Sequence, residues 1–319
     1  MEYRNELNKR YHKKILEKQK TLPEFVNTYI AASMTALETS TLYQYVTDLS
    51  VFFDFIGKDI SFDEFKTLSH TKIDEFVSYY KMGRSDKTLS RMLASISALY
   101  AYYIKIQRIS YNPVSAIRKP KHAKKEINRL KGNEKNELLN TVATGYGLSK
   151  HELRFHTKLK DRDLAICTLF LSTGIRVSEL VGLNINDIDF DLHGIVVTRK
   201  GGSSDFVYFS DEAESYLKNY ISVRKPNVGE DALFLSRNGN RLDVRSVERL
   251  IKKYCATALP SHKGLSPHKL RSTFGTDFYE ASGGDLLLTQ KRMGHKNIAT
   301  TTLYAEATKQ RESESRNLV

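Results

Sequence analysis

Five side chains in the C-terminal half of this 319-residue chain could together act on a phosphate ester. Arg176 lies in the segment STGIRVSEL, and His268 and Arg271 form an HxxR pair. Further along, His295 precedes Tyr304 by nine residues. Arginine holds phosphate oxygens in bidentate fashion, histidine transfers protons near neutral pH, and a tyrosine oxygen can attack phosphorus. The set therefore predicts a site where a phosphodiester is held and attacked.

Each of these residues also has an ordinary structural explanation when it is taken alone. Arg176 could simply pair with Glu179, because the i, i+3 spacing places both on one helix face. His295 follows Gly294 where a helix ends, a common place for a capping or surface histidine. Tyr304 is one of 18 tyrosines, most of which must be core or interface residues. The chemical interpretation depends on the joint occurrence.

A sixth candidate is Lys200, at the tip of a predicted β-hairpin. Residues 194–199 and 205–209 are rich in strand-forming residues, and the sequence KGGSS joins them. Glycines beside the lysine let the backbone approach a ligand closely. Lys200 could therefore reach a phosphate or a leaving oxygen, although an exposed turn lysine is the simpler alternative.

The charge balance favours a polyanionic partner. The chain has 50 Lys plus Arg against 37 Asp plus Glu, a net charge of +13. An excess of positive charge of this size is typical of nucleic-acid binding, although a merely basic protein remains an alternative. A hydrophobic content of 40% is enough for real cores, and the length suggests two domains.

Other sequence features point to the cytoplasm. Cys167 and Cys255 lie far apart in apolar patterns, which predicts core thiols and not a disulfide or zinc site. No apolar run approaches a membrane span, and the charged first 20 residues have no signal-peptide core. The chain is therefore expected to be cytoplasmic.

The N-terminal third is predicted to be entirely helical. Residues 1–20 indicate a charged helix or arm. Residues 21–117 then show apolar residues repeating every three or four positions, with breaks at Gly57, Gly83 and Asn112-Pro113. This pattern predicts a small domain of four or five helices.

A basic segment with a proline follows at residues 118–126 and lacks apolar periodicity, so it is predicted to be an inter-domain linker. Lying along a phosphate backbone would favour its charges, although a solvated connector is the alternative. The candidate DNA-binding residues here are Arg118, Lys119, Lys121, Lys124 and Lys125.

The second domain, residues 127–319, is predicted to be mostly helical around a small antiparallel sheet. Residues 143–160 are polar and rich in turn formers, which predicts a loop or short helical insertion. Helices are expected from the apolar periodicity over 163–172, 176–181, 211–223, 244–258, 270–281, 286–293 and 300–307. The fold class is thus mainly α, with a mixed α/β second domain.

In these ordered motifs the chain resembles the tyrosine recombinase family, also called the phage integrase family. The resemblance rests on STGIRVSEL, the hairpin lysine, HKLR, MGH and TTLY, in order and at family-like spacing, and on the helix TLSRMLASISALY before Asn112-Pro113. The size of the chain is similar to that of Xer-type recombinases. The resemblance implies a SAM-like core-binding domain followed by a catalytic domain.

The resemblance also implies roles for the candidate residues. Tyr304 would attack the phosphate and form a 3′-phosphotyrosyl link, with no metal or nucleotide cofactor. Arg176, Arg271 and His295 would hold the phosphate oxygens. His268 would transfer a proton near Tyr304, Lys200 would protonate the leaving 5′-oxygen, and Glu179 would be an accessory to Arg176.

The implied partner is double-stranded DNA with an inverted-repeat site. Two such sites would be held by a homotetramer, which exchanges strands through a Holliday junction, and the free protein would be a monomer or weak oligomer. Dimer resolution and the integration, excision or inversion of a mobile element both remain open. The alternatives are a type IB topoisomerase-like DNA relaxer and a non-catalytic DNA-binding protein.

Overall fold

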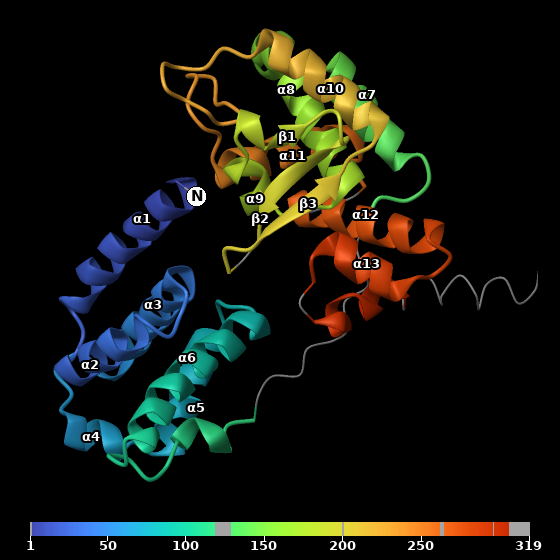
Figure 1. Cartoon of the computed structure of the whole chain (residues 1–319). Coiled ribbons are helices and arrows are strands. Elements are labelled where there is room, and N and C mark those ends of the chain that lie inside the picture. The colour runs from blue at the N-terminus through green and yellow to red at the C-terminus, as the bar shows by residue number, and fades with distance from the viewer. Residues whose placement is uncertain (1, 119–128, 200, 262–264, 296, 306–319) are drawn as a thin grey trace, which may run out of the picture. The chain divides into compact units, whose positions relative to one another are not determined.

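The computed structural model describes residues 2–118, 129–199, 201–261, 265–295 and 297–305. It divides into two compact units, Met1–Lys124 and Lys125–Val319 (Figure 1). Of the predicted DNA-contacting residues, only Arg118 is described, and it is exposed. Lys119, Lys121, Lys124, Lys125 and the hairpin Lys200 lie outside the described residues.

The N-terminal unit is helical wherever it is described, as predicted. Side-chain caps begin three of its helices: Ser61 accepts a hydrogen bond from the Glu64 amide, Ser69 from the Lys72 amide and Ser85 from the Thr88 amide. The elements are α1 Glu2–Gln19, α2 Glu24–Ser33, α3 Thr39–Ile56, α4 Phe62–Lys66, α5 His70–Lys81, α6 Asp86–Lys105 and the 3₁₀ turn η1 Pro113–Ala116.

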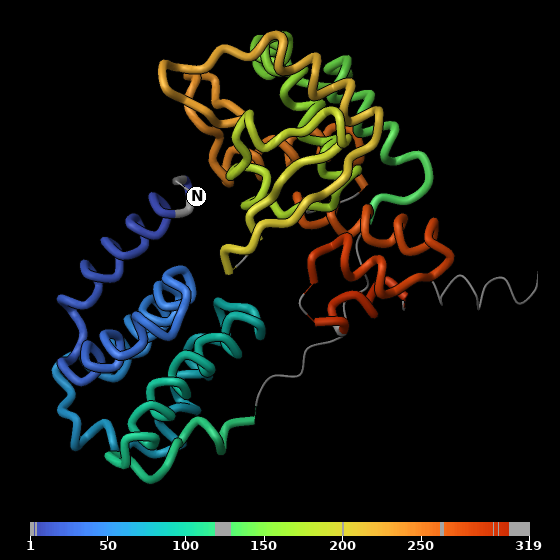
Figure 2. Tube along the Cα trace, viewed as in Figure 1, coloured from blue at the N-terminus to red at the C-terminus, as the bar shows by residue number. Residues whose placement is uncertain are grey.

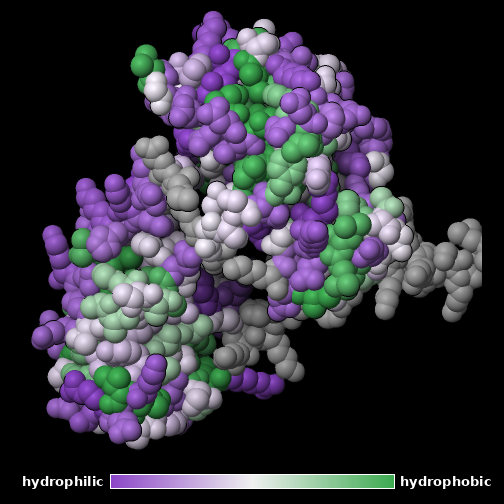
Figure 3. Space-filling view, viewed as in Figure 1, coloured by the Kyte–Doolittle hydropathy of each residue, from purple (hydrophilic) through white to green (hydrophobic). Residues whose placement is uncertain are grey.

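Helix α1 is part of this unit and not a separate arm. Its Ile15 is fully buried in the same core as α2 to α6. Tyr11 packs on Tyr43 of α3 with ring centroids 5.2 Å apart. The outer side of α1 exposes Lys9, Arg10 and Lys13, and this part of the surface is mostly hydrophilic in Figure 3. The charged character of the segment therefore describes only one side of the helix.

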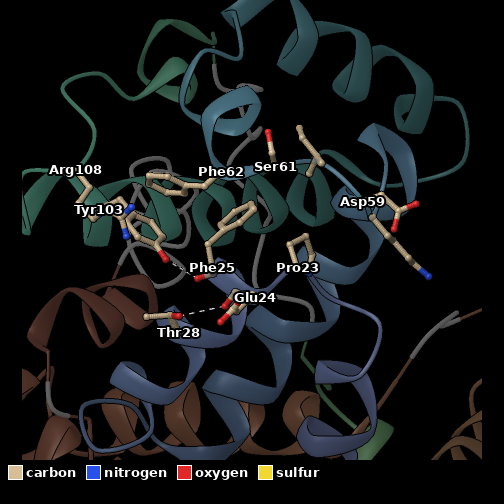
Figure 4. Close-up of a pocket in the computed structure, with 11 residues that line it drawn as sticks. Pro23, Glu24, Phe25, Thr28, Asp59, Ser61, Phe62, Tyr103 and Arg108 are labelled. Atoms are coloured by element: carbon tan, nitrogen blue, oxygen red, sulfur yellow. Dashed lines mark hydrogen bonds between the residues drawn. The ribbon is translucent and has the colours of Figure 1, made fainter.

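A pocket of about 470 Å³ lies in the N-terminal unit between the start of α2 and residues 58–62. Structural hydrogen bonds tie its walls together (Figure 4): the Tyr103 hydroxyl donates to the Phe25 carbonyl at 2.6 Å, and the Thr28 hydroxyl donates to the Glu24 carbonyl at 3.1 Å. The Arg108 guanidinium lies 4.5 Å from the centre of the Phe62 ring. The Tyr103 bond joins α6 to α2, and the Arg108 contact joins the segment after α6 to α4.

The C-terminal unit packs helices around a three-stranded antiparallel sheet of order β1-β2-β3. Helix α12 lies beside both α8 and α13 (Figure 2). The elements are α7 Glu134–Thr144, α8 Lys150–Thr173, α9 Val177–Gly182, η2 Ile185–Asp187, β1 Ile188–Asp189, β2 Gly194–Thr198, β3 Ser204–Tyr208, α10 Asp211–Val223, α11 Val244–Ala258, α12 Pro267–Ala281, α13 Leu286–Met293 and η3 Ile298–Thr300.

The predicted hairpin is confirmed, with Ile195 opposite Val207 and Thr198 opposite Ser204. Strand β1 was not predicted, because it contributes only two residues to the sheet. After η3, residues 302–305 are helical, which agrees with the expected start of the last helix.

Residues 143–160 were predicted to form a loop or short helical insertion; most of them are helical, but they belong to longer helices and not to a separate insertion. Residues 150–160 form the first half of the 24-residue helix α8. Ser149 and Glu152 form a reciprocal capping box that starts this helix. Most side chains of its first turns are exposed or half-buried, with His156 an exception; the helix is buried without interruption only from Arg162 to Phe170. Helix α7, before this range, was not predicted at all.

Other expectations about the interior hold. Cys167 and Cys255 are buried free thiols. Within the described residues, none of the helices is long and apolar enough to cross a membrane. The predicted fold class, mainly helical with a small antiparallel sheet in the second unit, is confirmed.

Candidate active site

The site begins at the junction between α8 and α9. Gly174 ends α8 in the left-handed conformation, with φ of 61°. A Cβ atom there would lie 2.3 Å from Cδ1 of Phe274. Glycine is therefore needed both for the turn and for the close approach of α12. The turn directs the chain so that Arg176 becomes the residue immediately before α9, not a residue of its first turn.

Arg176 forms the ion pair with Glu179 that the sequence offered as its structural explanation, and it also contacts the segment after α13. Its Nη1 donates to Glu179 Oε1 at 2.7 Å, and its backbone amide donates to Oε2 at 2.7 Å. Its Nη2 donates to the Gly294 carbonyl at 3.2 Å. The side chain keeps 35% exposure, whereas that of Glu179 keeps only 3%. A buried carboxylate thus fixes a guanidinium that still reaches solvent.

Arg271 is the most buried of the predicted residues. It projects from α12, whose first residue is Pro267, and only 3% of it is exposed. Its Nη1 donates to the Gly174 carbonyl and its Nη2 to the Met293 carbonyl. Burial, with a smaller effect from Arg176, lowers the pKa of Arg271 to about 10. The group therefore remains charged at neutral pH and joins three segments.

His295 follows the left-handed Gly294 that ends α13. Its Nδ1 lies 3.0 Å from the hydroxyl of Thr301, which is fully buried. Burial lowers the pKa of His295 to about 4, with further contributions from Arg271 and then Arg176. The imidazole is therefore neutral at pH 7 and is held with one nitrogen engaged.

Tyr304 is 6% exposed and packs with Phe274 and Met293. Its ring lies nearly parallel to that of His295, with centroids 6.1 Å apart. Gly275 makes room for it, because a Cβ atom on Gly275 would lie 2.6 Å from Tyr304 Cζ. Burial raises the pKa of Tyr304, and the charges of Arg271 and Arg176 act in the opposite direction. The phenol is thus protonated at rest, beside two cations.

Four predicted residues from three segments therefore meet: Arg176, Arg271, His295 and Tyr304, here called the Arg-His-Tyr cluster. His268, one helical turn before Arg271 on α12, is exposed. Its charge is one of those that lower the pKa of His295, which places it near the cluster. The position of Lys200 lies outside the described residues.

Arg199 is a residue of this region that the sequence interpretation missed. It is 7% exposed and binds Glu179 and Asp205. A signal for it existed, because Ile195 and Val197 are the buried residues of β2 and Arg199 continues their alternation. Thr301 and Gly275 were also missed, and neither carries a pattern that would distinguish it from other threonines and glycines.

Among the described residues, one group could hold a metal ion: His193, Asp211 and Glu214, on the β1–β2 turn and α10. The Glu214 carboxylate is already shared between His193 at 2.6 Å and Lys218 at 2.6 Å. None of these residues belongs to the Arg-His-Tyr cluster. The cluster itself offers guanidinium groups and suits an anion.

Comparison with known proteins agrees with this geometry. Residues 128–311 match the model described as the phage integrase family, and residues 24–107 match that of the phage integrase N-terminal SAM-like domain. The chain belongs to the phage integrase family. Members of this family are tyrosine recombinases, so the protein is an enzyme that cleaves and rejoins DNA in site-specific recombination.

Curated relatives of this phage integrase family member carry Xer names. Tyrosine recombinase XerC of Caldanaerobacter subterraneus subsp. tengcongensis is 33% identical over 306 residues, covering 89% of this chain and 82% of the relative. Tyrosine recombinase XerS of Streptococcus mutans is 31% identical over 337 residues, covering 91% and 94%. These matches span both units of the chain, so the relationship is not confined to the catalytic half.

Solved structures show the same fold. The XerH site-specific recombinase in a post-cleavage complex with palindromic difH substrate has a TM-score of 0.71 at 23% identity, covering 86% of this chain and 79% of that one. The Tn1549 transposon integrase in complex with a circular intermediate DNA has a TM-score of 0.70 at 20% identity, covering 91% and 98%.

Proposed function

We propose that this tyrosine recombinase cleaves duplex DNA by attack of the Tyr304 hydroxyl oxygen on a phosphodiester held by Arg176 and Arg271. The observation that carries the proposal is the convergence of the Arg-His-Tyr cluster. Its guanidinium groups reach it from the α8–α9 turn and from α12, and its histidine and tyrosine come from the segment after α13. Burial raises the pKa of Tyr304, and the charges of Arg271 and Arg176 partly offset this rise.

The chemistry balances without an external energy source. A bond forms between Tyr304 Oη and phosphorus, and the bond from phosphorus to the 5′-oxygen breaks. Arg176, Arg271 and His295 stabilise the charge that develops on the non-bridging oxygens, and a positioned set of this kind is usually the largest catalytic contribution. The phosphotyrosyl link conserves the bond energy, so a second 5′-hydroxyl can reverse the step on another strand.

Two proton transfers complete the step. The Tyr304 proton must leave because burial raises the pKa of the phenol. His268, near the cluster, is the proposed acceptor. The departing 5′-oxygen needs a proton, which we assign to Lys200 because it directly follows Arg199 in the sequence. Glu179 supports Arg176 through two hydrogen bonds and takes no proton in this scheme.

The proposed partner is double-stranded DNA carrying an inverted-repeat site. The net charge of +13 supports this partner, as does the palindromic substrate in the XerH complex. Strand exchange between two sites requires four active sites, so we propose a homotetramer on DNA. The basic segment 118–126, with Arg118, Lys119, Lys121, Lys124 and Lys125, is proposed to follow the phosphate backbone. The reaction would take place in the cytoplasm.

The decisive test uses a duplex site selected from a random DNA library by the full-length protein. A nick placed next to the cleavage position traps the covalent product, which is counted on a denaturing gel. The wild type should form a protein–DNA adduct, and Tyr304→Phe should form none while retaining DNA binding in a gel shift. Tyr279→Phe is the matched control, because Tyr279 packs against the same apolar group as Tyr304.

Adduct formation by Tyr304→Phe would show that another residue is the nucleophile. The two alternatives from the sequence are not favoured, because the relatives are named tyrosine recombinases and the cluster is complete where it is described. Relaxation of supercoiled plasmids without the selected site would nevertheless support the topoisomerase-like alternative. Absence of any wild-type adduct would support the binding protein.

A further inference from the structure

We infer that Arg199 is a positioning residue for the recombination reaction. It binds one oxygen of the Glu179 carboxylate, so that the charge of Arg176 stays available to the DNA phosphate. The inference rests on the proposed function. It concerns a side chain with no role in the predicted set.

Arg199 is inside the protein because of its place on β2. Ile195 and Val197 of β2 are fully buried, and the same alternation turns Arg199 inward, with 7% exposure. Its backbone pairs across the turn end of the hairpin. The Arg199 amide donates to the Ser203 carbonyl at 2.7 Å, and the Gly202 amide donates to the Arg199 carbonyl at 3.0 Å. Burying a guanidinium costs free energy unless it is paired, so the partners of Arg199 indicate what it does.

Those partners are two carboxylates on different elements. Nη1 donates to Glu179 Oε2 at 2.9 Å, whereas Nε and Nη2 donate to Asp205 Oδ2 at 3.1 and 3.0 Å. Asp205 lies on β3 and Glu179 on α9. A planar guanidinium can serve both carboxylates at once, which a lysine cannot do. Arg199 therefore ties the hairpin to the helix that Arg176 precedes.

The consequence for Arg176 is electrostatic. The Glu179 oxygens are divided, with Oε1 on the Arg176 guanidinium and Oε2 between the Arg176 amide and Arg199. Among the described residues, three guanidinium groups, those of Arg176, Arg199 and Arg271, thus accompany the carboxylates of Glu179 and Asp205. Without Arg199 the numbers would be equal, and the buried Glu179 charge would act on Arg176 alone. The phosphate would then meet a nearly neutral site.

Gly294 provides an independent indication that Arg199 is held against the cluster. A Cβ atom on Gly294 would lie 2.6 Å from Arg199 Cζ and 2.7 Å from Nε. The guanidinium therefore lies against the bare backbone of the residue that precedes His295. The carbonyl of this glycine also accepts the hydrogen bond from Arg176. Arg199 thus packs on one side of the segment that carries two members of the site.

The test measures single-turnover adduct formation on the nicked selected site for Arg199→Ala, Glu179→Gln and the double variant. Arg199→Ala should slow adduct formation about 100-fold, the scale of removing one preorganised charge contact. Glu179→Gln should cost less, because the amide oxygen can still accept from Arg176. The double variant should be at least about tenfold faster than Arg199→Ala, since the unbalanced carboxylate is gone.

This recovery separates positioning from simple packing. If Arg199 only stabilised the hairpin, the two losses would add, and the double variant would be slower than either single variant; that result overturns the inference. Arg292→Ala is the matched control, because Arg292 anchors the same hairpin through the Tyr208 carbonyl at 3.0 Å without touching Glu179. It should retain nearly the wild-type rate.

Two further measurements keep the outcome interpretable. If Arg199→Ala does not fold, as judged by its melting curve, the larger uncharged variant Arg199→Gln replaces it in the cycle and should also recover with Glu179→Gln. The His295 imidazole, followed by NMR, should titrate at higher pH in the Arg199 variant, because Arg199 is one of the charges that lower its pKa. An unchanged titration with an unchanged rate refutes the inference. Absence of a wild-type adduct would instead refute the proposed function.

Discussion

The two units of the chain differ in what they bury. In the described part of the N-terminal unit, Asp48 is the only charged residue that is buried, whereas Phe52, Phe53, Phe76 and Tyr100 are all fully buried. The C-terminal unit buries Arg162, Asp163, Glu179, Arg199 and Arg271. Buried aromatic side chains stabilise a fold directly, while buried charges are costly and must be paired.

Not all of the buried charge in the C-terminal unit serves the site. Arg162 donates to Asp163 at 2.7 Å and to the Leu235 carbonyl at 2.8 Å, and the Tyr254 hydroxyl donates to Asp163 at 2.9 Å. This group joins α8 to α11, and Lys253 of α11 lies 4.0 Å from the same carboxylate. Its Arg162 and Asp163 are neighbours on one helix. The group around Arg176, Arg199 and Arg271 instead has more guanidinium than carboxylate groups, drawn from separate segments, and Arg176 keeps 35% exposure. Cations from separate segments that still reach solvent, and not burial of charge as such, therefore distinguish the candidate active site.

The largest expected effect comes from removing the most buried member of that excess. Arg271→Ala should slow adduct formation at least about 1,000-fold, because a preorganised hydrogen-bond donor to the phosphate is lost from a water-poor site. DNA binding in a gel shift should persist. The rate is measured by single-turnover cleavage of the nicked substrate.

The control for this variant is Arg224→Ala. Arg224 also donates to backbone carbonyls, those of Ala232 and Glu230 among them, but lies outside the cluster. It should melt at a lower temperature and still cleave at nearly the wild-type rate. Equal losses of rate in the two variants would show that carbonyl bridging, and not phosphate binding, is what Arg271 provides.

A methyl group placed beneath the nucleophile should have the next largest effect. In Gly275→Ala the new Cβ would lie 2.6 Å from Tyr304 Cζ, so the ring must move. A misplacement of this size should cost about 100-fold in the cleavage rate. Gly83→Ala is the matched substitution, since nothing lies within 4 Å of its new Cβ. A wild-type rate for Gly275→Ala would mean that Tyr304 takes another position when it reacts.

Truncation in the aromatic core should affect stability and leave the chemistry unchanged. Phe53→Ala should lower the free energy of unfolding of the N-terminal unit by about 3–5 kcal/mol, because Phe53 is fully buried. Phe53→Leu should cost less. Thermal denaturation measures the stability, and the adduct rate per folded molecule should stay constant. A slower chemical step in the folded variant would contradict the division of labour between the units.

The smallest effect is a shift in the titration of one histidine. In the free protein His295 should titrate near pH 4, because burial and then the Arg271 charge oppose its protonation. Since its folded pKa lies below the ordinary 6.5, its contribution to stability is complete above pH 6.5 and is lost as the pH falls toward 4. DNA should raise this pKa, because a phosphate favours the cation. NMR of the imidazole checks both values, and a DNA-independent midpoint would place His295 away from the phosphate.

Much of the helical framework could be predicted because its signals are local. Apolar spacing and capping residues set α10, α11 and α13 at the predicted bounds. The start of α8 escaped prediction because most of its first turns are exposed and carry few apolar residues. Helix α1 was recognised, but its attachment was not, since only a few contacts, those of Ile15 and Tyr11 among them, decide it.

The order of the reactive residue types, namely the two arginines, two histidines, the lysine and Tyr304, could be read from the chain alone. So could the glycines before Ile175 and His295, where left-handed turns are present. That Arg176, Arg271, His295 and Tyr304 meet, and that Glu179 is shared with Arg199, is visible only in the folded protein. These contacts join segments up to 118 residues apart, as between Arg176 and Gly294, and such pairings leave no periodic trace in a single chain.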